Sequence, residues 1–209
     1  RSDGAVVGFD VDVGKEIASR MGVELNYVTG EWSGLIEGLR NYRYDAILGS
    51  MAITKTRLET VDFSVPYYYS GAQLVVRKDS GITGPEMLGD KTIAVVTGTN
   101  FEQDVLDIGA TPKLYDDDNA TILELISGRV DGVITDKVVA LESIREIQGG
   151  DALMLAGDVI RLEEMGIALN KKDTKLKEKM NQILAEMHED GTLSAISKKW
   201  QGGVDITKK

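Results

Sequence analysis

Two charged side chains of opposite sign follow the two copies of a short repeated pattern. The first copy reads LIEGLRNYRYDAILGS over residues 35–50 and leads on to Arg57, and the second reads ILELISGRVDGVITD over residues 122–136 and ends on Asp136. A guanidinium can bind a carboxylate through two parallel hydrogen bonds, and a carboxylate accepts hydrogen bonds from an ammonium. Ligands of open α/β sheets bind beyond the carboxyl ends of the strands. The pattern therefore predicts two similar α/β lobes that hold a zwitterion between them.

Each of these groups also has an ordinary structural alternative. Arg57 could be a surface arginine that pairs with Glu59 or Asp62. Asp136 could serve only as the N-cap of the helix that follows it. Trp32, which opens another helix, could form a flat wall against a ligand or simply pack in the core. The residue types alone leave these alternatives open.

Two loops with glycine and small polar residues have the composition of ligand-binding segments. Gly49-Ser50-Met51-Ala52 follows a predicted strand, and glycine there lets backbone N–H groups approach a ligand closely. Thr97-Gly98-Thr99-Asn100 joins a predicted strand to a helix, and helix N-termini attract anions. Simple N-capping by Thr99 or Asn100 is equally compatible with the second loop.

Composition restricts the class of protein and its partners. The chain has 209 residues, of which 42% are hydrophobic and 28% charged, so it can form one or two compact domains. Its formal net charge of −10 argues against nucleic acid and anionic membrane surfaces as partners. The absence of cysteine excludes disulfides and thiolate metal sites, and it fits an extracytoplasmic protein. Its apolar runs are too short to span a membrane.

Common catalytic motifs are absent from the sequence. It contains no Gly-x-Ser-x-Gly, no His-Glu-x-x-His, no phosphate-binding Gly-Lys-Ser/Thr loop and no Gly-x-Gly-x-x-Gly. The single histidine, His188, is expected on a solvated helix face rather than in catalysis. We therefore expect a binding protein with no catalytic residue, no cofactor and no metal.

Alternating strand and helix patterns predict an α/β fold with mostly parallel pairing. Period-two or short apolar runs predict strands at residues 5–9, 24–28, 45–48, 72–77, 92–96, 113–115, 131–135 and 165–169. Helical spacing predicts helices at 13–21, 32–39, 55–60, 100 onward, 120–127, 137–147, and from Asp173 or Thr174 to Gly191.

A set of short motifs in order along the whole chain closely resembles the polar amino-acid-binding proteins of bacterial ABC importers, solute-binding protein family 3. The motifs are Gly8-Phe9-Asp10-Val11-Asp12, Glu31-Trp32-Ser33-Gly34-Leu35-Ile36, Tyr44-Asp45-Ala46-Ile47, Ile53-Thr54-x-x-Arg57, Val61-Asp62-Phe63-Ser64-x-Pro66-Tyr67, Gly98-Thr99, Asp131-Gly132-Val133-x-x-Asp136, Met165-Gly166-Ile167-Ala168, and Asp190-Gly191-Thr192-Leu193 with Lys199-Trp200.

This resemblance implies a type II periplasmic-binding-protein fold, in which two α/β lobes are joined by two crossing strands and close like a hinge. We expect lobe 1 to comprise residues 1–72 and 171–209, and lobe 2 to comprise residues 78–164. The crossing hinge strands would be residues 73–77 and 165–170. The family's first strand would precede Arg1, so this sequence is expected to lack it.

The resemblance also assigns roles to individual residues. It implies that Arg57 binds the α-carboxylate of an amino acid and that Asp136 binds its α-ammonium. Trp32 would form an aromatic wall, and Asp10 falls where members that bind lysine or arginine place a polar contact. Backbone and small side chains would complete the ligand-binding set, namely Gly49, Ser50, Met51, Ala52, Val96, Thr99 and Asn100.

Two of these positions depart from the family pattern. Ala52 stands where a Thr or Ser hydroxyl usually meets the carboxylate, so one hydrogen bond is lost or replaced by water. Asn100 stands where Thr is common, although its amide can still donate a hydrogen bond.

The resemblance implies a monomer that binds a free polar amino acid, cationic or neutral, and delivers it to an ABC permease in the membrane. It would act in the periplasm or outside the cell, after removal of a signal peptide and with or without a lipid anchor. Two alternatives remain, which are the ligand-sensing domain of a membrane receptor or kinase and a cyclohexadienyl-dehydratase-like enzyme on the same scaffold.

Overall fold

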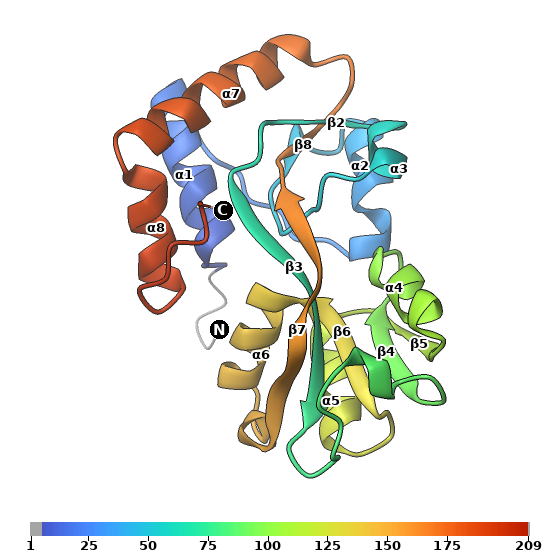
Figure 1. The fold of residues 1–209 in the computed structure, drawn as a ribbon. Helices are drawn as coiled ribbons and strands as arrows, with labels where there is room; N and C mark the ends of the chain where they lie inside the picture. The colour runs from blue at the N-terminus through green and yellow to red at the C-terminus, as the bar shows by residue number, and fades with distance from the viewer. Residues whose placement is uncertain (1–5, 209) are drawn as a thin grey trace. The chain divides into compact units, whose positions relative to one another are not determined.

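The computed structural model describes residues 6–208 of the chain (Figure 1). Its contacts divide the chain into two compact units. Unit 1 comprises Arg1–Gly30, Leu35–Tyr69 and Glu163–Lys209, and unit 2 comprises Glu31–Gly34 and Ser70–Leu162. Each unit therefore draws on segments that are far apart in sequence. The hinge role of residues 73–77 and 165–170 stays a prediction.

A five-stranded sheet forms the centre of unit 2, with the strand order β5-β4-β6-β3-β7. β4 pairs in parallel with both β5 and β6, whereas β3 is antiparallel to β6. The strands are β3 (Tyr68–Arg77), β4 (Thr92–Val96), β5 (Thr111–Tyr115), β6 (Gly132–Asp136) and β7 (Leu153–Met165). Parallel strands with intervening helices confirm the predicted α/β class.

Helices cover both faces of this sheet because its central strands are apolar on both sides (Figure 1). Leu74 packs in one core cluster with Phe101 of α4, whereas its neighbour Val75 packs in a second cluster with Ile122 of α5. The second cluster also contains Ala140 of α6. The helices and short 3-10 turns of the unit are α4 (Phe101–Ile108), α5 (Asp118–Ile126), α6 (Lys137–Glu146), η1 (Trp32–Gly34), η2 (Pro85–Met87) and η3 (Gly150–Ala152).

Unit 1 is built on a smaller sheet, with the strand order β1-β8-β2, in which both pairings are antiparallel. The sequence patterns did not indicate this antiparallel sheet. Its strands are β1 (Ala46–Ile47), β2 (Asp62–Phe63) and β8 (Ala168–Leu169). Its helices are α1 (Phe9–Met21), α2 (Leu35–Arg40), α3 (Lys55–Leu58), α7 (Thr174–Glu189) and α8 (Thr192–Trp200).

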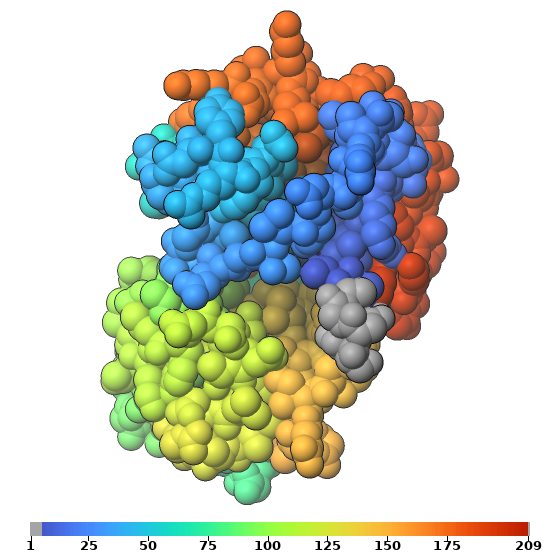
Figure 2. Space-filling view, turned by 180° about the vertical axis from the view of Figure 1, so that it is seen from behind, coloured from blue at the N-terminus to red at the C-terminus, as the bar shows by residue number. Residues whose placement is uncertain are grey.

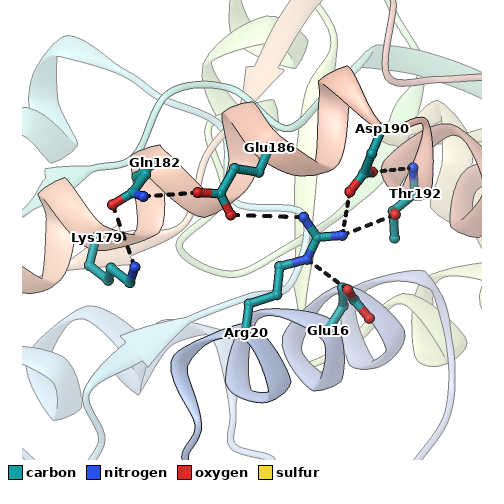
Figure 3. A network of polar contacts seen from close by, with 7 residues as sticks. All are labelled: Glu16, Arg20, Lys179, Gln182, Glu186, Asp190 and Thr192. Carbon is teal, nitrogen blue, oxygen red and sulfur yellow. Dashed lines mark hydrogen bonds and ion pairs between the residues drawn. The ribbon is translucent and has the colours of Figure 1, made fainter.

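A polar network joins the first helix of unit 1 to the last two. Arg20 Nε donates to Glu16 within α1 at 2.7 Å, while its Nη2 donates to Asp190 at 2.7 Å and to Thr192 at 3.1 Å (Figure 3). Hydrogen bonds from Thr192 and Arg20 lower the pKa of Asp190 to about 2. In Figure 2 the blue surface of the N-terminal helix region borders the red surface of the C-terminal helices.

The repeated helix–turn–strand pattern is confirmed in both units. In the first copy α2 leads into β1, and in the second α5 leads into β6. The turns close with equivalent backbone hydrogen bonds, Arg43 N–H to the Gly38 carbonyl and Arg129 N–H to the Glu124 carbonyl, both 3.0 Å.

Several predicted strands are wrong, each for a physical reason. Residues 6–8 form no strand and α1 begins at Phe9, where acidic residues in the first turn favour a helix start; Ala5 lies outside the described residues. Residues 24–28 alternate but are assigned to no strand, and Val28 is 61% exposed. The strand expected at 165–169 is instead the end of β7 and the separate β8, because the two segments join different sheets: β7 pairs with β3, and β8 pairs with β1 and β2.

Candidate functional site

Arg57 of unit 1 is buried, with only 9% of its surface exposed. It lies on the short helix α3, where Thr54 is the N-cap and accepts a hydrogen bond from the Arg57 backbone N–H at 3.2 Å. Its guanidinium Nη1 donates to the Ala52 carbonyl at 2.9 Å. Asp62, one of the partners considered for a surface arginine, pairs with Lys177 at 2.6 Å. This burial favours the ligand-binding interpretation over that of a solvated arginine.

The segment around Ala52 presents its backbone groups to two sides. Ile53 N–H donates to the Glu164 carbonyl at 2.9 Å, and the Met51 carbonyl accepts from Gly166 N–H at 3.2 Å. Backbone groups of successive residues in an extended segment point to opposite sides. Ala52 N–H therefore lies on the same side as its carbonyl, which contacts Arg57. The guanidinium and this N–H are thus two donor groups on the same side of the segment.

Ser50 precedes this segment in an uncommon backbone conformation. Its φ is 52°, in the left-handed region that non-glycine residues seldom occupy. Tyr68 Oη donates a hydrogen bond to Ser50 Oγ at 2.6 Å. Gly49 is half-buried, while Met51 and Ala52 are buried at 1% and 3% exposure. These four predicted contributors therefore lie in one loop after β1, and the last of them, Ala52, contacts Arg57.

Asp10 lies among tyrosine side chains in the first turn of α1. It accepts a hydrogen bond from Tyr67 Oη at 2.5 Å. Burial raises the pKa of Tyr67 well above its ordinary value, and the nearby Asp10 charge adds to that rise. The same two causes raise the pKa of Tyr27 to about 12. The ligand-binding role of Asp10 stays a prediction.

Asp136 of unit 2 is 3% exposed at the end of β6. Its Oδ1 accepts hydrogen bonds from the backbone N–H groups of Val138 at 2.9 Å and Val139 at 3.2 Å, so it caps α6. The capping role is thus present. A carboxylate has about four acceptor sites, so capping through one oxygen remains compatible with binding an ammonium.

The loop after β4 is ordered by hydrogen bonds to Val96. The backbone N–H of Thr99 donates to the Val96 carbonyl at 3.2 Å, and the Thr99 hydroxyl donates to it at 2.7 Å. Asn100 occupies the N-cap position of α4 but makes no side-chain capping hydrogen bond. The alternative of N-capping by the Thr99 or Asn100 side chain therefore does not explain why these residue types occur in the loop.

Trp32 belongs to the short segment Glu31–Gly34, which groups with unit 2, whereas the segments before and after it belong to unit 1. Its Nε1 donates to the Gly98 carbonyl at 3.3 Å, and the side chain is half-buried. Gly98 has a φ of 79°, which suits glycine. Trp32 thus lies beside the loop that contains Thr99 and Asn100.

Several residues of these surroundings were missed by the sequence reasoning. Tyr67 and Tyr68 were given no part in the site from the sequence, yet their hydroxyls donate to two predicted site residues, Asp10 and Ser50. Asp118, which the sequence patterns did not single out, begins α5 and accepts a hydrogen bond from Thr135 Oγ1 at 2.6 Å, and burial raises its pKa. The three successive tyrosines at 67–69 were the signal in the sequence, but their hydroxyl partners are distant along the chain.

Across residues 6–208, no group of three or more His, Cys, Asp or Glu side chains could hold a metal ion. No helix over the same residues is long and apolar enough to cross a bilayer.

Several known proteins similar to this chain are named as amino-acid-binding proteins. The L-cystine-binding protein TcyJ of Escherichia coli is 34% identical over 99% of this chain and 78% of its own length. An ancestral arginine-binding protein solved with arginine is 36% identical, with a TM-score of 0.89 over 96% of this chain and 90% of that one. The ancestral amino acid-binding protein AncCDT-1, a precursor of cyclohexadienyl dehydratase, is 31% identical, with a TM-score of 0.88 over 96% and 88% of the two chains.

These structural matches confirm the predicted type II periplasmic-binding-protein fold class. The sequence profile of one family matches residues 1–203, which is nearly the whole chain. The chain therefore belongs to the bacterial extracellular solute-binding proteins, family 3.

Proposed function

We propose that this protein binds a free polar amino acid and delivers it to an ABC-type permease in the membrane. The observation that carries the proposal is the buried Arg57, whose guanidinium contacts the Ala52 carbonyl at 2.9 Å in unit 1. A guanidinium that is removed from water favours a carboxylate partner, and free amino acids supply one.

The α-carboxylate is bound by three kinds of donor in unit 1. Arg57 supplies the charge, Ala52 supplies a backbone N–H on the same side, and Ser50 supplies a hydroxyl. Ala52 has no hydroxyl of its own, so the hydrogen bond that a Thr or Ser would make there is absent or passes through water. The carboxylate thus exchanges hydration for fixed donors, which is the condition for tight binding of a charged group.

The α-ammonium is bound by Asp136 of unit 2, whose carboxylate is buried at the end of β6. The site extends to the start of α4, where Val96, Thr99 and Asn100 contribute. Trp32 provides a flat apolar surface. A ligand that contacts residues of both units favours any conformation in which all contacts are made at once. We propose hinge closure about residues 73–77 and 165–170 on that basis.

The preferred ligand is a cationic or neutral polar amino acid. Asp10 contributes a negative charge near the proposed site, which favours a cationic side chain. Similar proteins are named for binding cystine, histidine and arginine, and one ancestral arginine-binding protein was solved with glutamine. The protein acts as a monomer in the periplasm or at the outer surface of the cell, with or without a lipid anchor.

A second candidate function is enzymatic, because AncCDT-1 is a precursor of cyclohexadienyl dehydratase. Such an enzyme needs a general acid in its site and no partner for an ammonium. Asp136, as an ammonium acceptor, favours capture without turnover. The ligand-sensing domain of a membrane receptor or kinase would use the same residues, and a membrane-spanning segment beyond Lys209 in the gene would identify it.

A thermal-shift screen of the twenty common amino acids and L-cystine tests the proposal. A ligand that binds only the folded state at 100 times its Kd stabilises it by about 2.7 kcal/mol. We expect at least one polar amino acid to raise Tm by several degrees, with confirmation by calorimetry. No shift with any compound, or turnover of a cyclohexadienyl acid such as prephenate, would contradict the proposal.

A further inference from the structure

Tyr68 is buried and held in place from several sides. Only 1% of its surface is exposed, and its ring packs edge-on against Phe9 and Tyr67 at centroid distances of 5.2 and 4.9 Å. The backbone on either side is fixed as well, since Tyr67 N–H donates to the Met165 carbonyl at 3.0 Å and Tyr69 N–H to the Ile206 carbonyl at 2.9 Å. The Tyr68 hydroxyl is therefore a rigid donor.

This donor reaches the one residue of the loop after β1 that has a strained backbone. Tyr68 Oη donates to Ser50 Oγ at 2.6 Å, and Ser50 has a φ of 52°. A non-glycine residue persists in that region only when its surroundings hold it there. The hydrogen bond supplies such a restraint through the side chain rather than through the backbone.

The direction of the hydrogen bond also orients the serine. Because Ser50 Oγ accepts the Tyr68 proton, its own proton must point elsewhere and can be donated to another group. Ala52 and Arg57, two residues and seven residues further along the chain, supply the N–H and guanidinium donors described above. Fixing the Ser50 hydroxyl thus places a third donor with them.

We infer that Tyr68 is a positioning residue for amino-acid binding, which acts through Ser50 to hold the carboxylate-binding loop in its competent conformation. The inference rests on the proposed function, since it assigns Ser50, Ala52 and Arg57 to the carboxylate. Tyr68 itself does not contact the amino acid. A donor held in advance loses less conformational freedom on binding, so affinity depends on a hydroxyl that the ligand never touches.

The test replaces Tyr68 by phenylalanine, which removes only the hydroxyl. Tyr44→Phe is the matched control in the same unit, because the Tyr44 hydroxyl donates to the Leu35 carbonyl at 2.5 Å, outside the loop. Calorimetry is carried out with L-arginine and with L-glutamine. The amino acid that binds the wild type should bind Tyr68→Phe about tenfold more weakly, as expected for one lost hydrogen bond. Tyr44→Phe should bind like the wild type.

Two further measurements separate positioning from a general loss of stability. In a Ser50→Ala background, Tyr68→Phe should change the affinity less than twofold, because its route through Ser50 is already gone. In the unliganded protein, Tyr68→Phe should speed amide hydrogen exchange over residues 49–52 more than Tyr44→Phe does.

The outcomes distinguish this inference from the proposed function. Wild-type affinity in Tyr68→Phe, or an equal loss with and without Ser50, overturns the role of Tyr68 and leaves amino-acid binding intact. Absence of binding by the wild type to every compound of the thermal screen overturns the proposed function and this inference with it.

Discussion

The two copies of the helix–turn–strand unit share a turn but differ in the strand that follows. Their turn hydrogen bonds match at positions 86 residues apart, as in Asn41 N–H to the Glu37 carbonyl and Ser127 N–H to the Leu123 carbonyl, 3.1 and 3.0 Å. Yet β1 has two residues and β6 has five. β6 lies between two partner strands, whereas β1 pairs with β8 alone among the strands of residues 6–208. Local sequence therefore determines the turn, and tertiary neighbours determine the strand.

The difference continues beyond the strands, where the candidate site begins. The short β1 ends early and is followed by the loop of residues 49–52 and then by Arg57 on α3. The longer β6 runs directly into α6, with Asp136 as the N-cap. The first copy is thus followed by a loop and then by a buried cation on a short helix, and the second ends in a buried anion at a helix start. Both charged groups follow the carboxyl end of a strand, as expected for α/β ligand sites.

Removing the cation of the first copy should have the largest effect on binding. We expect Arg57→Ala to weaken binding of the amino acid selected in the thermal screen by about 100-fold or more, roughly 3 kcal/mol, because a desolvated carboxylate loses its charged partner. Calorimetry measures the change. Arg43→Ala, an exposed arginine in the repeated turn, is the control. Near-native affinity of Arg57→Ala would show that the carboxylate binds elsewhere.

Neutralising the anion of the second copy should have the next largest effect. Asn is as good an N-cap as Asp, so Asp136→Asn keeps the cap of α6 and removes only the charge. We expect at least tenfold weaker binding with a stability change within about 0.5 kcal/mol. Asp117→Asn is the matched control, since Asp117 caps α5 by accepting from Ala120 N–H at 2.8 Å. Equal affinities of the two variants would leave Asp136 with a capping role alone.

The elements that were predicted correctly carry their determinants in their own sequence. β4 has the predicted bounds, Thr92–Val96, because it is a β-branched apolar run that is covered on both faces. Residues 24–28 alternate equally well but form no strand, since alternation specifies a face and does not supply a partner strand. Strand formation in unit 1 thus depended on information outside the segment.

The same limit applies to the candidate site. The charges of Arg57 and Asp136 could be proposed from residue type and position after a strand. The contact of Tyr68 with Ser50 joins residues 18 positions apart, and that of Tyr67 with Asp10 joins residues 57 apart. No local pattern links such pairs, so the hydroxyl network required the folded chain.

A third pair of variants compares equivalent aspartates in the two turns. Asp131 Oδ2 accepts from the Thr92 backbone N–H at 2.8 Å and so connects β6 to β4, whereas Asp45 is exposed. We expect Asp131→Ala to lower the free energy of unfolding by about 1–2 kcal/mol, because a backbone donor loses a charged acceptor. Asp45→Ala should change it by less than about 0.5 kcal/mol. Urea unfolding of both variants measures this difference. Equal losses of unfolding free energy would mean that the two aspartates contribute equally to stability.

The smallest expected effect concerns the left-handed residue of each turn, which is Tyr42 in the first copy and Gly128 in the second, with φ values of 56° and 73°. A Cβ at Gly128 would come no closer than 3.8 Å to Arg77, so Gly128→Ala is opposed only by its backbone conformation and should cost about 1 kcal/mol. Tyr42→Gly relieves that strain but removes a phenol that interacts with the nearby Asp173, and it raises the entropy of the unfolded chain. We therefore expect its net gain to stay below about 1 kcal/mol in urea unfolding. If Tyr42→Gly lowered the free energy of unfolding more than Gly128→Ala does, side-chain contacts rather than backbone strain would determine which residue is favoured at this position of the repeat.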